Sequence, residues 1–242
     1  MSATISLTQS QIFTGLGAVL HSFGLVPPTI QIVQGQVNRV PSPAGSDYIV
    51  LWPIARNRLA MNIDTQTDIQ CIGAIFNNVL TATSVPIGPL AQGQTIYGTG
   101  VAAGCQIVNQ INGPTGGAGT YTTTPTANAT GTFYCGTSAK MQETEVTIQA
   151  DVHGPNSADN SARIQTLFRD QFGCDAFAAT GVALAPLYTS DPRQTAFENG
   201  EQQVEERWSI DLTMQANVTI TVTQQFADKL QATATSVATI PA

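Results

Sequence analysis

The feature that most constrains the fold is an unbroken alternation near the C-terminus, WSIDLTMQANVTITV at residues 208–222. Its even-numbered positions carry Trp, Ile, Leu, Met, Ala, Val, Ile and Val, and its odd-numbered positions carry Ser, Asp, Thr, Gln and Asn. A period of two over this length predicts one β-strand with an apolar face and a polar face. Ordinary strands have about five or six residues, so the chain must supply pairing partners for an unusually long strand.

The charged residues divide the chain into two regions. Only 10% of the 242 residues are charged, and residues 69–139 contain no Asp, Glu, Lys or Arg, so all 16 acids and 9 bases lie outside them. Within 69–139, short Val, Ile and Tyr runs alternate with turn-forming segments such as GPTGGAGTY, a pattern typical of short strands joined by tight turns. We therefore expect a small all-β domain at 69–139, inserted into a discontinuous domain made of 1–68 and 140–242.

The remaining sequence predicts an α+β main domain. An apolar stripe at helical spacing ends at Gly24 and Pro27, and a second helix is expected to begin at Ser157 as N-cap and to stop at Gly173. The run at 48–54 is expected to be a strand buried on both faces, and 59–68 a strand that neighbours 143–153. The expected helices are 9–23, 157–172, 174–180 and a closing helix at 224–230; the expected strands are 29–33, 48–54, 59–68, 145–153 and 208–222, with a turn-rich loop at 35–45 and a loose tail after 230. This predicts a mixed or antiparallel sheet flanked by two or three helices.

The overall charge excludes some classes of protein. The formal net charge is −7 and the sequence pI is about 4.6, so the chain should repel nucleic acid rather than grip it. The richest apolar run, YIVLWPIA at 48–55, is far shorter than the ~20 residues of a membrane-spanning helix. We expect neither a DNA reader nor a membrane protein.

The cysteines are expected to be free thiols. The start MSATISLTQS lacks the basic and apolar parts of a secretory signal, which favours synthesis in a reducing cytosol. Cys71, Cys105, Cys135 and Cys174 show no CxxC spacing, so burial as unreacted thiols is favoured over a zinc site or a disulfide.

Candidate catalytic chemistry is sparse. His153 follows Asp151 by two residues on the same strand face, and a nucleophile such as Cys174 would complete a hydrolase; the favoured interpretation is a solvated strand end before Gly154. The segment GTGVAAG at 98–104 resembles a dinucleotide fingerprint, but the strand-like CQIVNQI follows it instead of a helix. We expect no catalytic, cofactor-binding or metal-binding residues.

An acidic cluster precedes the long strand. The segment FENGEQQVEER at 197–207 carries four acids near Arg193 and Arg207. Paired carboxylates can perform acid–base catalysis. A solvated hairpin with its turn at Asn199-Gly200 is the favoured interpretation.

Several blocks together resemble the neck or tail-terminator proteins of bacteriophages with contractile tails. They include GQVNRVP (35–41), YIVLWPI (48–54), RLAMNIDT (58–65), TEVTIQADVHGPNSAD (144–159), LFRDQFG (167–173) and the long block from APLYTSDPRQ to QQFADKL (185–230). The resemblance covers most of 1–68 and 140–242. The uncharged segment at 69–139 departs from it and looks like a Gly/Thr-rich add-on module of phage proteins.

The resemblance implies a structural virion protein without enzymatic activity. Such proteins resemble an α+β unit that assembles as a ring, typically a hexamer, which caps the tail tube, docks to the head connector and lets genome DNA pass. The implied partners are sister copies, the tail tube, the sheath and the head-completion protein, in the host cytoplasm before assembly and in the virion after it. A connector or stopper ring nearer the portal is an alternative, as is a binding module whose β insert contacts a host glycan or a capsid protein.

The long strand gives this implied ring a means of contact. We expect the ribbon at 193–222 to find partners in sister copies, because assembly satisfies strand edges that are otherwise hazardous. The candidates for contacts between subunits or with the tube are Arg193, Glu201, Glu205, Glu206, Arg207 and Trp208.

Overall fold

The computed structural model describes residues 3–36, 46–195, 197–198 and 204–224. The chain forms two compact units, one with Met1–Thr4, Asp64–Ala139 and Thr221–Ala242, the other with Ile5–Ile63 and Lys140–Ile220. We call the first the glycine-rich unit and the second the helical unit. Strands dominate the described residues and three helices accompany them, so the fold is mostly β rather than a balanced α+β arrangement.

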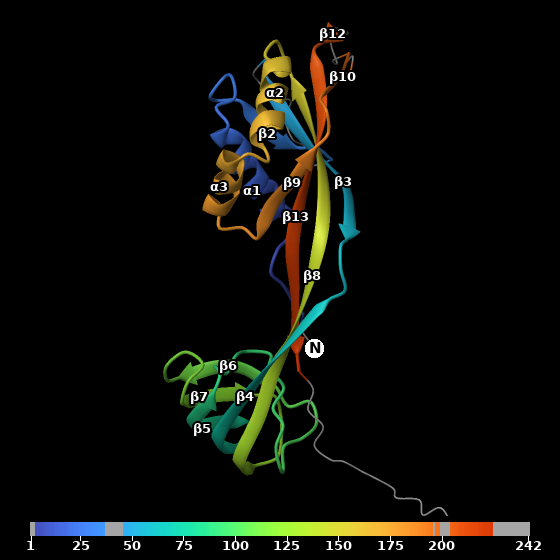
Figure 1. Cartoon of the computed structure of the whole chain (residues 1–242). Coiled ribbons are helices and arrows are strands. Elements are labelled where there is room, and N and C mark those ends of the chain that lie inside the picture. Colours follow the sequence, from blue (N-terminus) through green and yellow to red (C-terminus); the bar gives the residue numbers. More distant parts are fainter. Residues whose placement is uncertain (1–2, 37–45, 196, 199–203, 225–242) are drawn as a thin grey trace, which may run out of the picture. The chain divides into compact units, whose positions relative to one another are not determined.

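A twisted sheet forms the base of the helical unit. Strand β2 (Gln31–Gln34) runs parallel to β3 (Tyr48–Arg58), and β3 pairs antiparallel with β8 (Ala129–His153). Strand β13 (Arg207–Thr223) follows β8 in the strand order, and β9 (Leu184–Thr189) and β10 (Arg193–Gln194) pair with β13. Helices α1, α2 and α3 all lie on the same side of this sheet (Figure 1).

Strand β13 confirms the predicted long strand. It has 17 residues, and Ile210, Leu212, Met214, Ala216 and Val218 are all buried on its apolar face. The strand order places β8 beside it, and its pairing with β10 at Trp208 and Ser209 and with β9 at 212–216 is antiparallel. Near its end, Ser6 donates its backbone N–H to the Thr219 carbonyl (2.9 Å), as β1 (Thr4–Ile5) joins the sheet. The long strand thus finds ladder partners inside its own chain, and the expected contacts of the 193–222 ribbon with sister copies stay a prediction.

Helix α1 (Gln9–Ser22) forms as predicted and provides the centre of the core. Thr8 and Gln11 form a reciprocal capping box at its start. Leu16 and Leu20 are completely buried against the apolar faces of β3, β8 and β13.

Two further helices complete the core, but their bounds differ from the prediction. Helix α2 (Ser157–Leu167) has Asn156 rather than Ser157 at its N-cap, and α3 (Gln171–Ala179) contains Gly173 instead of ending a helix there. The Asp170 carboxylate accepts from the Phe172 N–H (3.0 Å), which caps a new helix start at this point.

Aromatic packing joins these helices to the core. Phe168 and Phe177 are buried and meet edge to face, with ring centroids 5.5 Å apart at 88°. Phe172, the last residue of the helix expected at 157–172, is 50% exposed because the break before α3 turns it outward.

Two strand predictions fail in detail. In β3 only Ile49 and Leu51 of the 48–54 run are buried, so the strand has one buried face instead of two. Strand β4 (Ile63–Phe76) begins four residues later than expected. It neighbours β8 in the strand order, and Leu59 donates its N–H to the Glu143 carbonyl (3.0 Å), but over 144–153 the partner of β8 is β3, with Asn57 opposite Glu145. A register shift between Pro53 and Ala55 accompanies this pairing and extends β3 to Arg58.

The described residues of the glycine-rich unit form strands and turns, and short strands occur between 79 and 123 as the sequence pattern predicts. It contains most of β4, then β5 (Val79–Ile87), β6 (Ile107–Asn112), β7 (Gly119–Thr123) and the first part of β8. Asn77 and Asn78, with φ of 48° and 62°, join β4 to β5, and two such residues are typical of a type I′ hairpin turn. Tyr121, Phe133 and three thiols, Cys71, Cys105 and Cys135, lie in its core.

All four cysteines are free, and Cys174 in the helical unit is half-buried. No helix within the described ranges has both the length and the apolar character needed to cross a bilayer. The expected closing helix and tail beyond residue 224, and most of the loop at 35–45, lie outside the described residues.

Candidate intersubunit surface

Residues at both ends of the acidic cluster pair as in the predicted hairpin, and the predicted turn at Asn199-Gly200 lies outside the described residues. Strand β11 (Phe197–Glu198) pairs antiparallel with β12 (Val204–Glu205), with Phe197 opposite Glu205 and Glu198 opposite Val204. Because opposite residues of a ladder share a face, Glu198 and Val204 lie on one side of the hairpin and Glu205 on the other. Glu205 faces the sheet, whereas Val204 is 82% exposed.

Glu205 contacts a buried histidine. One carboxylate oxygen lies 3.4 Å from His153 Nδ1, and the other accepts from the Tyr48 hydroxyl (3.4 Å). The rings of Tyr48 and His153 stack with centroids 4.3 Å apart and 9° between their planes. His153 is only 3% exposed, so its interpretation as a solvated strand end is wrong.

Burial controls the protonation of this group. Removal from water lowers the pKa of His153, although the nearby carboxylates of Glu205 and Asp151 act in the opposite direction. Burial, and then the adjacent Glu205 charge, raises the pKa of Tyr48 to about 12. At neutral pH the stack therefore contains a neutral imidazole and a neutral phenol.

Asp151, which was expected to face solvent with His153, carries a buried carboxylate. It is 5% exposed and accepts from Ser209 Oγ (2.6 Å) and Gln149 Nε2 (2.7 Å), while Arg207 Nη1 lies 3.7 Å from its other oxygen. Hydrogen bonds and a nearby cation offset the cost of burying a carboxylate. This arrangement fixes the start of β13 against β8.

The structure places five of the six predicted contact residues near the start of β13, and Glu201 lies outside the described residues. Arg193 forms an ion pair with Asp211 (3.0 Å), and Trp208 Nε1 donates to Glu206 (3.0 Å). Glu205 and Arg207 contact His153 and Asp151 as described above. These contacts are within one chain, so they hold the hairpin in place and leave Glu198, Val204 and Glu206 exposed at its surface.

Sequence reasoning missed the exposed Val204 and the buried position of His153. The alternation in 197–207 gives no apolar face long enough to draw attention to one valine. Only the pairing of β11 with β12 shows that Val204 shares a face with Glu198.

The hydrolase hypothesis finds no support in the placement of Cys174. This residue belongs to α3, and its Sγ donates to the Arg169 carbonyl (3.9 Å) at the start of that helix. Asp151 and His153 lie on β8, where their polar atoms face Ser209, Arg207 and Glu205. Across the part of the chain that the structure describes, no group of three or more His, Cys, Asp or Glu residues is arranged to hold a metal ion.

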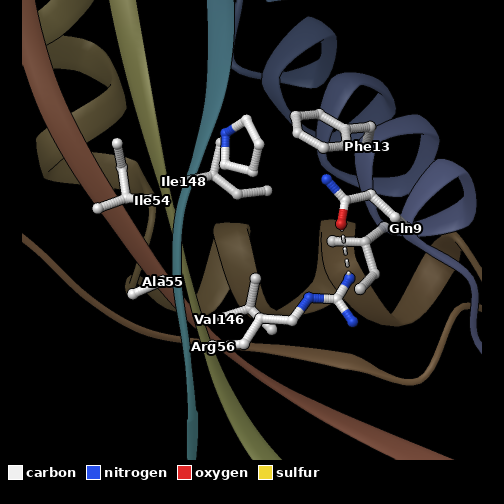
Figure 2. A pocket seen from close by; sticks show the side chains of 9 residues that line it. Gln9, Phe13, Ile54, Ala55, Arg56, Val146 and Ile148 are labelled. Carbon is white, nitrogen blue, oxygen red and sulfur yellow. Dashed lines mark hydrogen bonds between the residues drawn. The ribbon is translucent and has the colours of Figure 1, made fainter. Parts of the chain in front are cut away.

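An apolar pocket of about 170 Å³ lies between α1 and β3 of the helical unit. Phe13, Val146 and Ile148 line it, and Arg56 Nη2 donates to Gln9 Oε1 (3.2 Å) beside it (Figure 2). The other lining residues are Ile12, Pro53, Ile54 and Ala55.

A protein-family model described as phage neck terminator protein matches residues 95–237. The chain belongs to this phage neck terminator family. The match includes β13 and the hairpin, and it begins inside the uncharged segment, so it does not stop at the border of the predicted insert. No curated protein matches the chain. A neck terminator is a structural component of the virion, which agrees with the predicted family and with the predicted place in the phage particle.

Proposed function

We propose that this neck terminator protein forms a homo-oligomeric ring, a hexamer, at the junction of head and tail. The ring terminates the tail tube, contacts the sheath, docks to the head-completion protein and lets the genome pass through its lumen. Copies are made in the host cytoplasm and join the tail there. The family match over residues 95–237 is the observation that carries this proposal.

The charge of the chain supports a role in DNA passage. A net charge of −7 gives a surface that repels phosphates, so DNA slides past it instead of binding. A ring that gripped the genome would slow its exit.

Ring contacts require surface that stays exposed in the folded chain. Arg193, Glu205, Arg207 and Trp208 have partners in their own chain, which supports a role for them in holding the hairpin. We propose that the outward side of the hairpin, with Glu198, Val204 and Glu206, makes the contact with the next copy.

Electron microscopy of a phage lacking this gene tests the proposal. We expect full heads and separate tails of irregular length, because the tube has no terminator and no docking face. Supplying the wild-type chain should restore joined particles of normal tail length. Joined, infectious particles in its absence would refute the proposed role, and joined tails with a defect in DNA retention would favour the connector or stopper layer.

A second candidate function rests on the outer face of the glycine-rich unit. Ile72, Phe76 and Tyr134 are 44%, 64% and 45% exposed, and the neighbouring positions Thr81 and Thr83 are also exposed and uncharged. Such a face suits contact with a host glycan or a capsid protein. Replacing residues 69–139 by a short turn tests this: particles that join normally but fail to adsorb would assign binding to this unit, and normal adsorption would exclude it.

A further inference from the structure

We propose that the hairpin of one copy docks on a specific surface of the next copy, which consists of the pocket between α1 and β3 together with Arg56, Arg58, Leu59 and Met61. We call this the acceptor surface, and we call Glu198, Val204 and Glu206 the hairpin face. The inference rests on the proposed ring and names the surface that each hairpin recognises.

The hairpin face combines one apolar side chain with acids. Val204 is 82% exposed, Glu198 lies directly opposite it in the ladder, and Glu206 follows two residues later. Glu205 on the other side of the hairpin is held by His153 and Tyr48, and Gly154 donates its N–H to the Glu206 carbonyl (2.9 Å). These contacts hold Glu205 and Glu206 on their own subunit, which lowers the ordering cost of presenting the outward side at association.

The acceptor surface offers the complementary features. Its pocket of about 170 Å³ is lined by Phe13, Val146 and Ile148, and has room for a branched aliphatic side chain. Beyond the pocket, Leu59 and Met61 are 48% and 86% exposed. They lie on the segment that joins β3 to β4, so this exposed apolar surface directly follows Arg58.

Two arginines give this surface its positive charge. Arg56 Nη2 donates to Gln9 Oε1 (3.2 Å), and Arg58 Nη2 donates to Asn62 Oδ1 (2.6 Å). An amide oxygen carries no net charge, so these hydrogen bonds do not neutralise the guanidinium groups. Figure 2 shows Arg56 reaching from β3 towards α1 beside the pocket, where an approaching carboxylate would meet it.

The two surfaces differ and lie on the same chain, which determines the type of assembly. A contact between unlike surfaces is heterologous and produces a closed ring or an open filament. In this contact Val204 would enter the pocket, and the carboxylates of Glu198 and Glu206 would pair with the two arginines. Each copy would then have one side that carries the hairpin and one side that accepts it. A second copy of this chain is therefore the partner that these surfaces fit.

Charge reversal tests the contact in the full chain. The three variants are Glu198→Arg with Glu206→Arg, Arg56→Glu with Arg58→Glu, and the combination of all four changes. Native mass spectrometry and sedimentation velocity report the oligomer, and circular dichroism reports folding. Asp159→Arg with Asp175→Arg, which changes two exposed helical acids and shifts the net charge equally, is the matched control for the hairpin variant.

We expect each reversed pair to weaken association by roughly tenfold or more, because like charges then face each other. The combined variant, and an equal mixture of the two reversed variants, should assemble again, while the control should assemble like wild type. The acceptor surface is refuted if either reversed variant forms rings as readily as the wild type does. It is also refuted if the combined variant folds but does not assemble. Both outcomes leave the proposed ring intact. A wild-type chain that stays monomeric at all concentrations and on tail tubes would overturn the ring itself.

Discussion

The ring of Tyr48 lies parallel to the imidazole of His153, with 4.3 Å between their centroids and 9° between their planes. The two residues are opposite each other in the ladder of β3 and β8, and Glu205 of the hairpin contacts both. Stacking on Tyr48 and burial by the hairpin together shield the imidazole from solvent. A change in the protonation of His153 would therefore act on the contact between Glu205 of the hairpin and its own sheet.

We expect stability to fall as the pH falls below about 6.5, the ordinary pKa of histidine. Burial lowers the pKa of His153 in the folded chain, so the unfolded chain binds its proton more readily and acid favours unfolding. The contribution of His153 is complete above the unfolded pKa and is lost as the pH falls towards the folded one. One proton changes the unfolding free energy by at most about 1.4 kcal/mol per pH unit.

Urea denaturation between pH 5 and 8 measures this effect, with His153→Asn as the comparison because its side chain does not titrate. The variant should show a shallower loss of stability on acidification. If the wild type instead gains stability relative to the variant at low pH, the attraction between imidazolium and Glu205 outweighs burial.

We expect Ser209→Ala to destabilise the helical unit by about 1.5–3 kcal/mol, the usual cost of removing a hydrogen bond to a charged group. Its Oγ donates to Asp151 at 2.6 Å in a buried site, so water does not replace it. Chemical denaturation followed by circular dichroism gives the difference. Ser10→Ala on the exposed side of α1 is the control, with an expected change within about 0.5 kcal/mol.

We expect Gly73→Ala to destabilise the glycine-rich unit, because the new methyl group would lie 2.1 Å from the Thr81 carbonyl oxygen. A backbone atom does not move aside cheaply, so a cost of about 1–3 kcal/mol or more is expected. Gly17→Ala in α1 meets nothing within 4 Å and should stabilise by about 0.5–1 kcal/mol. Thermal melting of both variants should therefore give shifts of opposite sign.

We expect alkylation to discriminate between the cysteines. Burial raises the pKa of Cys71 to about 11 and of Cys135 to about 12, and the thiolate is the reactive form. Cys174 is half-buried and should be the first to react with iodoacetamide at pH 8, as measured by peptide mass spectrometry. Rapid modification of Cys135 in the native chain would show that the core of this unit opens readily.

The sequence predicts those elements whose pattern is both long and local. The alternation in β13, the apolar stripe of α1 and the short strands of the glycine-rich unit were read correctly because burial of one face governs each of them. The hairpin of 197–207 was also predicted from its turn residues. The family resemblance rested on longer blocks and is confirmed.

The failures depend on contacts between distant segments. Nothing local to Asp151 and His153 shows that the hairpin covers them, so both were expected to face solvent. The helix expected at 157–172 ends at Leu167, because the Asp170 carboxylate caps a new helix start that the apolar stripe does not reveal. The partner strands of β13 were sought outside the chain, although β9 and β10 precede it closely in sequence.

Strand β3 shows how the chain avoids uncontrolled association. Among the described residues, β8 pairs with β3 from Tyr48 to Arg58, whereas β2 pairs with it only as far as Leu51, so the second edge of β3 is open from Trp52 onward. This open edge includes Pro53, which lacks an N–H, carries the register shift before Ala55 and continues with Arg56 and Arg58. Proline, irregular spacing and charge are the means by which natural edges resist templating a foreign strand. Two copies of this chain can therefore meet through side chains without fusing their sheets into fibrils.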